Sequence, residues 1–434
     1  MERTVNRRDF LGSVAAASAT LLAATRTSGA QTLAIETLGA PQAPAGRRLK
    51  AGLIGCGGRG RGAMINFMDA GPGLEIAALA DVFPDRLEAA RTQLKKLKGI
   101  DLPDNRLFSG FDAYQKLIDT DVDVVLHCTP PHFRPQHFAA AVAAGKHSFL
   151  EKPVAVDPVG VRSVLATAEQ AASKGLSVMT GTQIRRMRSR IETRNRIADG
   201  SIGDILAVRT FRNQGALWYR LRQDGWSDME WMLRDWVNWN WLSGDHIVEM
   251  HIHHLDQILW VMGRAPKTAV GMGARLRRQT GDQYDFFSVD YAFDDGVHWH
   301  STIRQVRGCS NLRDESLVGT KGVASLSDAA IYDHSGKVAW KYEGEENDAL
   351  IQEHADLVTA IRTEKPINTA KDTAIATLIA IMGRESAYTG KTVTMEEMMA
   401  STLRLGPTSY ALGPVALPAE PPIPGVDSAP IESL

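Results

Sequence analysis

Three residues from two distant parts of the sequence have the side chains needed for hydride and proton transfer: Lys152, Glu249 and His253. Glu249 and His253 are four residues apart, so in a helix they share one face, where the carboxylate can orient the imidazole. Such a histidine can take the proton of a hydroxyl group while the same carbon loses hydride to a nicotinamide. A nearby lysine cation would stabilise the developing alkoxide. The trio therefore predicts chemistry at a CH–OH group.

A glycine-rich segment, Gly55-Cys56-Gly57-Gly58-Arg59-Gly60, satisfies the pattern G-x-G-x-x-G. Glycine in this pattern permits a tight turn, a close approach of the backbone to a pyrophosphate, and close packing of a helix on a strand. Asp81 follows the next expected strand, where a carboxylate accepts hydrogen bonds from the adenosine ribose hydroxyls. These features predict a dinucleotide site that prefers NAD. Arg59, Arg61 and Arg86 leave NADP open, because they could meet a 2′-phosphate.

The elements that must position these residues alternate between short apolar runs and helical segments, which predicts a doubly wound parallel sheet of Rossmann type. The expected strands cover residues 49–54, 75–80, 122–128 and 147–150, and the expected helices cover 61–70, 84–98, 131–144 and 157–174. Lys152 then lies just beyond the carboxyl end of a strand, on the edge where such sheets bind ligands. The alternative is a lysine that only projects from the surface.

After about residue 180 the pattern changes to longer strands, which predicts an α+β domain with a large, mostly antiparallel sheet. Strands are expected over 205–212, 268–276, 286–293 and 297–304, and the last two should form a hairpin with a turn at Gly296. Helices over 349–362 and 370–388 are expected to return to the first domain. The expected organisation is a signal peptide (1–30), an arm (31–47), an NAD(P)-binding domain (48–180), a substrate and oligomerisation domain (181–348), returning helices (349–400) and an irregular tail (401–434).

The first thirty residues have the order of an export signal. Arg7 and Arg8 form a twin-arginine pair, an uncharged stretch covers residues 11–24, and Ser28-Gly29-Ala30 resembles a cleavage site. This order predicts a twin-arginine signal peptide and a periplasmic protein. The alternative is a disordered or short amphipathic N-terminus. Only three cysteines are present, too few for a disulfide framework, which suits a chain that folds in the cytoplasm before export.

The composition excludes some classes of partner. The chain has 434 residues and a formal net charge of −1, which gives no electrostatic argument for binding nucleic acid. No uncharged apolar run reaches the ~18 residues of a transmembrane helix. We therefore expect no nucleic-acid partner and no membrane span.

Several motifs together resemble the Gfo/Idh/MocA family, which includes glucose–fructose oxidoreductases and inositol dehydrogenases. They are the glycine segment, Asp81, the segment His127-Cys128-Thr129-Pro130, Glu151-Lys152-Pro153, residues 180–186 and residues 249–256. The similarity covers residues 48–395. The Glu-Lys-Pro motif together with the later histidine helix is its most specific part. One departure is Glu249, which stands where the family often has aspartate.

The resemblance implies roles for individual residues. Lys152 is expected to contact both the nicotinamide ribose and the reacting hydroxyl, with His253 as acid/base partner and Glu249 beside it. Arg185 is expected to contact the substrate. The residues expected at the cofactor are Gly55, Cys56, Gly57, Gly58, Arg59, Gly60, Asp81, Thr129, Pro130, His132, Glu151, Lys152 and Gln183. The family also often dimerises through the open sheet of its second domain, so a homo-oligomer is expected.

Tryptophans cluster before the histidine helix, and indole rings cover the apolar face of a sugar well. Most are expected to be core or interface packing, with Trp218 favoured as a substrate contact. The cluster comprises Trp218, Trp226, Trp231, Trp236, Trp239 and Trp241.

Metal binding is a rival hypothesis, because His246, Glu249 and His253 have metal-ligand spacing on one helix. We expect no metal, and we expect His251 and His254 to be structural residues.

An exported nicotinamide enzyme has no soluble cofactor pool, so the cofactor should be tightly bound and reset in place. Two chemistries achieve this: oxidation of one sugar with reduction of a second, or transient oxidation that permits elimination at a glycosidic bond. The first predicts a sugar or polyol oxidoreductase. The second predicts a redox-neutral, glycoside-cleaving enzyme. A cofactor- or carbohydrate-binding protein without turnover is the third alternative.

Overall fold

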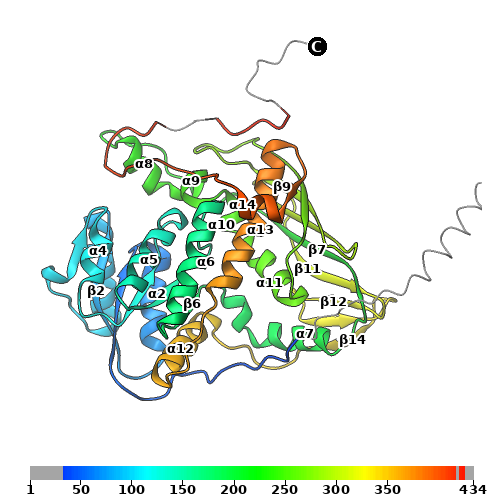
Figure 1. The fold of residues 1–434 in the computed structure, drawn as a ribbon, viewed down its shortest axis with the longest axis horizontal. Helices are drawn as coiled ribbons and strands as arrows, with labels where there is room; N and C mark the ends of the chain where they lie inside the picture. The colour runs from blue at the N-terminus through cyan, green and yellow to red at the C-terminus, as the bar shows by residue number, and fades with distance from the viewer. Residues whose placement is uncertain (1–32, 417–419, 426–434) are drawn as a thin grey trace, which may run out of the picture. The chain divides into compact units, whose positions relative to one another are not determined.

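The computed structural model describes residues 33–416 and 420–425 (Figure 1). The expected signal peptide lies outside the described residues, as do residues 417–419 and the end of the expected tail, 426–434. In the described part of the chain, no helix is both long enough and apolar enough to cross a membrane.

Residues 49–180 contain a six-stranded sheet in which all neighbouring strands are parallel. The order is β3-β2-β1-β4-β5-β6, so the chain changes direction across the sheet between β1 and β4, where such sheets bind ligands. The strands are β1 (Leu49–Ile54), β2 (Leu74–Asp81), β3 (Leu107–Ser109), β4 (Val124–His127), β5 (His147–Leu150) and β6 (Val178–Thr180). This sheet confirms the predicted Rossmann architecture.

Helices connect these strands and bury their apolar runs; every residue of β4 is buried. Asp157 accepts a hydrogen bond from the Gly160 N–H (2.7 Å) and so caps α6, as its position before a proline suggests. The helices are α2 (Gly58–Asp69), α3 (Pro84–Lys98), α4 (Ala113–Ile118), α5 (Arg134–Ala143) and α6 (Pro158–Ser173), with 3-10 turns at Asp104–Arg106 and Pro131–Phe133. The helix expected from residue 61 begins three residues earlier, inside the glycine segment.

A nine-stranded sheet forms the second domain, in the order β14-β13-β12-β11-β7-β10-β9-β8-β15. The predicted hairpin is present as antiparallel β9 and β10, with Gly296 at φ 82°. One pairing was not expected: β10 runs parallel to its neighbour β7. The strands are β7 (Ile205–Gln214), β8 (Thr268–Ala274), β9 (Phe286–Ala292), β10 (His298–Gln305), β11 (Leu312–Gly319), β12 (Val323–Ser325), β13 (Ala330–Tyr332), β14 (Val338–Lys341) and β15 (Val393–Thr394).

Helices fill the space between the two sheets (Figure 1). The long helix α13 contacts α6 on one side and β8 on the other, and α12 packs on the core of the first domain. The remaining helices are α7 (Arg188–Ala198), α8 (Asp228–Arg234), α9 (Asn240–Ser243), α10 (His246–Glu249), α11 (Ile252–Met262), α12 (Ala349–Arg362), α13 (Ala370–Thr389) and α14 (Met395–Ala400), with 3-10 turns at Gln183–Arg186 and Trp236–Asn238.

The expected arm and tail are both held against the folded domains. In the arm, Ala43 N–H donates to the Ala70 carbonyl (2.8 Å), and Glu36 accepts a hydrogen bond from the Trp260 indole (2.7 Å). The tail lacks regular structure, as expected, but it runs beside α8 (Figure 1), where Met229 N–H donates to the Gly413 carbonyl (3.1 Å). The tail is therefore held against α8.

Candidate functional site

The glycine segment joins β1 to α2 and leaves no room for side chains at its first and last glycines. Gly55 has φ 94°, and a Cβ atom on it would lie 2.6 Å from the Cys128 backbone. A Cβ atom on Gly60 would lie 1.9 Å from the Gly55 carbonyl oxygen. The first glycine therefore makes the turn and the last one lets α2 pack against β1, as the G-x-G-x-x-G pattern predicts.

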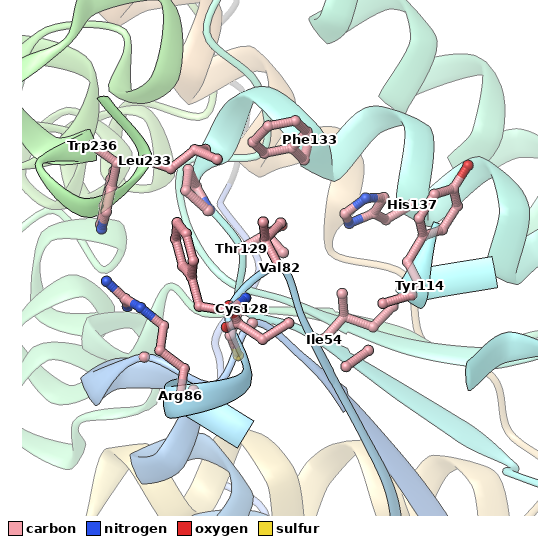
Figure 2. Close-up of a pocket in the computed structure, with 18 of the residues that line it drawn as sticks. Ile54, Val82, Arg86, Tyr114, Cys128, Thr129, Phe133, His137, Leu233 and Trp236 are labelled. Carbon is pink, nitrogen blue, oxygen red and sulfur yellow. The ribbon is translucent and has the colours of Figure 1, made fainter. Parts of the chain in front are cut away.

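A cavity of about 500 Å³ opens beside this segment (Figure 2). Its walls include the glycine segment, the end of β2 at Asp81, and the residues Cys128, Thr129 and Pro130 that follow β4. Because these are carboxyl ends of parallel strands around the switch point of the sheet, the cavity lies where dinucleotides bind in this architecture.

Asp81 reaches the cavity from the end of β2 and also organises the loop. Its two carboxylate oxygens accept hydrogen bonds from the backbone N–H groups of Cys56 (2.7 Å) and Phe83 (3.0 Å). Burial raises the pKa of Asp81, and the two backbone donors and Arg86 act against that rise. A carboxylate oxygen has further acceptor capacity, so Asp81 can still receive ribose hydroxyls.

Arginines surround the same end of the cavity. Arg61, Arg86 and Arg220 all line it, and Figure 2 shows Arg86 of α3 pointing toward Trp236. Arg59 differs from these three arginines, because its guanidinium forms ion pairs with Glu151 and with Glu353 of α12 (3.3 Å for Glu353). Arg59 is therefore engaged by two carboxylates rather than directed at a 2′-phosphate.

The cavity fits a nicotinamide dinucleotide. Among the described residues no side chain caps the N-terminus of α2, so its first N–H groups remain for a pyrophosphate. A Cβ atom on Gly58 would meet no protein atom within 4 Å, which leaves the backbone accessible at that point. Asp81 supplies acceptors for a ribose. The residues that would hold the cofactor here are those of the glycine segment, Asp81, Thr129 and Pro130.

The Glu-Lys-Pro motif follows β5 and is held by buried charges. Glu151 is buried and pairs with Arg59, which joins this motif to the glycine segment. Arg134, which the sequence analysis did not select, is also buried and donates to the carbonyl oxygens of Thr129 (2.6 Å) and Pro153. It thus ties the end of β4 to the residue after Lys152.

Lys152 contacts Glu249 across the boundary between the two domains. Its Nζ donates to the Glu249 backbone carbonyl (2.7 Å) and lies 3.3 Å from the carboxylate Oε1. Both side chains are largely shielded, at 13% and 12% exposed. Buried Arg384 of α13 supports this junction, because it donates to the carbonyl oxygens of Val156 (2.8 Å) and Gly244 (3.0 Å). The structure therefore brings two of the three predicted catalytic residues into contact.

His253, the third predicted catalytic residue, comes from the helix that follows Glu249 and feels the charge of Lys152. Burial lowers the pKa of His253 well below its usual range, and the Lys152 cation lowers it further. Glu249 and His253 are not on one continuous helix, as the sequence analysis expected. Glu249 ends α10 and His253 belongs to α11, because the His251 N–H bonds to the His246 carbonyl five residues back (3.1 Å). Such a local widening of the helix is often found at functional sites.

The other histidines of this region have protein partners. His246 Nδ1 lies 2.7 Å from Asp245, His251 Nε2 lies 2.7 Å from the Ser301 hydroxyl, and His254 pairs with buried Glu315. Within residues 33–416 and 420–425, no group of three His, Cys, Asp or Glu side chains is arranged to hold a metal ion. The geometry thus gives the metal hypothesis no support.

Several predicted site residues lie outside the cavity beside the glycine segment. Arg185 forms a two-point ion pair with Asp256 (2.7 and 2.8 Å) and a third contact with Asp372 (2.9 Å), so it joins three helical segments. Gln183 begins the 3-10 turn that contains Arg185. His132 contacts the tail, with its Nε2 2.6 Å from the Tyr410 hydroxyl.

The tryptophans divide as expected into packing residues and cavity residues. Trp239 and Trp241 are buried in a cluster with Phe83 and Phe133. Trp218 and Trp236 line the cavity beside the glycine segment, and Trp218 is 44% exposed. The sequence analysis placed Trp218 at the substrate, whereas the structure places it in the same cavity as Asp81.

Comparison with known proteins agrees with this geometry. Residues 49–180 match the GFO_IDH_MocA model, an oxidoreductase family with an NAD-binding Rossmann fold, and residues 191–325 match the GFO/IDH/MocA C-terminal domain. The inositol 2-dehydrogenase of Paracoccus denitrificans is 27% identical over 214 residues, which cover 49% of this chain and 54% of that protein. A glycosyl hydrolase family 109 protein of Streptomyces coelicolor is 33% identical over 179 residues, 38% of this chain and 36% of that protein.

The fold also resembles that of solved structures. A scyllo-inositol dehydrogenase from Lactobacillus casei, with bound NAD(H) and scyllo-inositol, superimposes with a TM-score of 0.61 at 20% identity, covering 80% of this chain and 99% of that one. The chain spans only about a third to two thirds of the length of the curated relatives it matches first. Because the two matched domains together cover more than half of the chain, the protein belongs to the Gfo/Idh/MocA family of oxidoreductases.

Proposed function

We propose that this protein transfers hydride between a CH–OH group of a sugar or polyol and a tightly held nicotinamide cofactor, with NAD favoured over NADP. The observation that carries the proposal is the contact of Lys152 with Glu249 at the carboxyl end of the Rossmann sheet, where the Lys152 charge also lowers the pKa of His253. The similarity to an inositol 2-dehydrogenase supports a polyol or sugar as the substrate class.

Each residue of the trio has a defined part in this chemistry. When bound, the nicotinamide supplies a hydride acceptor or donor. A ring nitrogen of neutral His253 takes the proton of the reacting hydroxyl, and returns it in the reverse direction. The Lys152 ammonium stabilises the negative charge that develops on the substrate oxygen. Glu249 holds the Lys152 ammonium in place through its carbonyl and carboxylate.

Three measurements test the proposed reaction: the identity of the bound cofactor, its reduction by added substrates, and the effect of variants. Purified protein is washed and denatured, and the released nicotinamide is identified by mass and absorbance; about one NAD per chain is expected. Inositols, hexoses and their glycosides are then added, and the absorbance band of the reduced cofactor is followed in a single turnover. Lys152→Ala should abolish reduction without lowering the cofactor content. Lys116→Ala, in a surface pair with Asp112, should behave as wild type.

A redox-neutral, glycoside-cleaving reaction is a second candidate, favoured by the similarity to a glycosyl hydrolase family 109 protein. In that case the trio would move the protons, while a bound nicotinamide would accept hydride from a sugar carbon and return it after the leaving group is eliminated and water adds. A glycoside would be cleaved without net accumulation of reduced cofactor, and solvent deuterium would enter the product beside the oxidised carbon. Net reduction without cleavage would instead support the oxidoreductase.

We also propose that the protein is exported by the twin-arginine route and retains its cofactor outside the cytoplasm. The support is the order of Arg7-Arg8, the uncharged stretch and Ser28-Gly29-Ala30 in the sequence. A periplasmic fraction containing the protein with bound NAD is the expected result. Retention of the unprocessed chain in the cytoplasm would contradict the proposal, and the change of Arg7 and Arg8 to lysine should prevent export.

A further inference from the structure

Residues from two segments outside the Rossmann sheet form part of the wall of the cavity beside the glycine segment. Trp218, Arg220, Leu233 and Trp236 come from the segment 215–238, and Tyr410 comes from the tail. We propose that these two segments form a clamp over the adenosine half of the dinucleotide and set the rate at which it is released. This inference rests on the proposed function, because it requires a dinucleotide in the cavity.

The composition of the cavity shows which half of a dinucleotide the clamp would cover. Asp81 and Arg86 line it on the β2 side, whereas Lys152, Glu249 and His253 are not among its lining residues. The clamp therefore faces the ribose-binding carboxylate and not the catalytic trio. Its indole and phenol rings provide flat apolar surfaces suited to a purine ring.

The two segments are joined to each other. The Met229 N–H of α8 donates to the Gly413 carbonyl of the tail (3.1 Å), and the Val415 N–H donates to the Asp228 carboxylate (3.2 Å). Figure 1 shows the tail running alongside α8. Because of these hydrogen bonds, movement of either segment away from the cavity must disturb the other segment.

The clamp is also fastened to the Rossmann domain at two places. Arg234 of α8 pairs with Asp85 of α3 (3.1 Å) and lies 4.0 Å from the Phe83 ring centroid. At the second place, Tyr410 forms a hydrogen bond with His132 (2.6 Å) and stacks on Phe111, at 6.1 Å between ring centroids. These contacts must break before the clamp can open, which makes them determinants of cofactor release.

The proposal is tested by measuring release of labelled NAD from the full chain after dilution into excess unlabelled NAD. Trp218→Ala, Tyr410→Ala and Arg234→Ala should each accelerate release at least tenfold. Arg91→Ala is the matched control: Arg91 also lies on a helix of this region and pairs with Asp101 (3.0 Å) and Asp104 (2.9 Å), away from the clamp, and should release NAD at the wild-type rate. Tyr410→Phe, which loses only the hydroxyl, should fall between wild type and Tyr410→Ala.

ADP-ribose, which has the adenosine half but no nicotinamide, distinguishes the clamp from a general loss of structure. Its affinity should fall in the clamp variants by the same factor as that of NAD, while their melting temperatures without ligand stay close to wild type. Wild-type release rates in both Trp218→Ala and Tyr410→Ala would overturn the clamp and leave the proposed function intact. If wild-type protein bound neither NAD nor ADP-ribose, the proposed function would fall as well.

Discussion

The Lys152 cation acts on His253 through its charge, and it lowers the pKa of that histidine. Burial is the largest cause of the lowered pKa of His253, which lies well below 6.5, and the charge of Lys152 is the second largest cause. A histidine with a lowered pKa stays neutral throughout the neutral range and ionises only at acid pH. The base form needed to accept a hydroxyl proton is therefore already present at neutral pH.

Removal of the cation should raise the pKa of His253. In Lys152→Met the neutral methionine leaves burial as the main remaining cause, so the titration midpoint should move up toward 6.5. Histidine-selective NMR of the full chain measures this midpoint, with His253→Gln to assign the resonance. Lys116→Met is the control and should leave the midpoint in place. A midpoint that stayed fixed, or moved lower, in Lys152→Met would mean that the two side chains are not neighbours in solution.

Sequence patterns identify residues of this site better than they identify the contacts of those residues. Lys152 follows a short apolar strand, and the sequence therefore places it at the ligand-binding edge of the sheet. The partners of Arg59 could not be predicted in this way, because one of them, Glu353, lies 294 residues further along the chain. No local pattern could show that this arginine of the glycine segment is engaged by two carboxylates. Arg134 was missed for another reason: its acceptors are backbone carbonyls, which the residue types do not reveal.

At the scale of elements, the close approach of α2 to β1 depends on a single missing side chain. Gly60→Ala would place a Cβ atom 1.9 Å from the Gly55 carbonyl oxygen, so the helix must move. We expect it to lower the free energy of unfolding by about 3 kcal/mol, at the upper end of overpacking substitutions. Gly58→Ala lies two residues away in the same helix and meets nothing within 4 Å. Urea unfolding without ligand should therefore give a near wild-type value for Gly58→Ala.

The two variants separate packing from cofactor binding. Gly58 lines the cavity, so Gly58→Ala should weaken NAD binding at near wild-type stability. Equal stabilities for the two variants would contradict the assignment of the third motif glycine to helix packing.

The helical region around His253 shows where an element prediction failed. The sequence from His246 to Met262 has no glycine or proline to mark a break, so a continuous helix was a reasonable expectation. The break lies after Glu249, where the N–H groups of Met250 and His251 both bond to the His246 carbonyl. At the start of α10, Asp245 has φ 70° and its carboxylate accepts hydrogen bonds from the His246 and Tyr284 N–H groups. Contacts of this kind are made in the tertiary structure, and the local sequence does not show them.

At the scale of the whole molecule, the sequence predicted two sheets of the correct type but not how their strands are ordered. In the first sheet, the handedness rule for βαβ units fixes the hand of each crossover but not the order of the strands. In the second sheet, the parallel pairing of β10 with β7 joins strands about ninety residues apart, and no local pattern indicates it. The wrapped arm and tail were also beyond prediction in detail, since their contacts are mainly single hydrogen bonds to distant backbone groups.

Burial lowers the pKa of several histidines, and this shift should make the protein less stable in acid. Burial lowers the pKa of His127, His251, His253 and His354 well below 6.5, that of His132 to about 4 and that of His137 to about 3. In the unfolded chain these residues gain protons below pH ~6.5, whereas in the folded chain they stay neutral. These histidines therefore lower the free energy of unfolding as the pH drops from about 7 toward 4. Buried carboxyl groups oppose this trend, because burial raises the pKa of Glu353, Asp81, Asp235, Asp256, Asp356 and, to about 6, Asp282.

His354 is suited to testing this acid sensitivity. It is fully buried, its ring lies 4.2 Å from that of Phe149 and 6.1 Å from that of Phe67, and neither ring nitrogen has a hydrogen-bond partner in the described structure. His354→Phe keeps an aromatic ring there and removes one proton-binding group from the unfolded chain. Between pH ~6 and ~5 the slope of unfolding free energy against pH should become shallower by about 1.4 kcal/mol per pH unit.

Urea unfolding of the full chain at a series of pH values measures this slope. Phe67→Leu is the control, because it alters the same packing cluster without changing proton binding: it should lower stability by a similar amount at every pH and leave the slope unchanged. If His354→Phe kept the wild-type slope while Phe67→Leu behaved as expected, His354 would have to be protonated in the folded protein. That outcome would require a carboxylate or a buried water beside its ring, in place of the apolar contacts with Phe67 and Phe149.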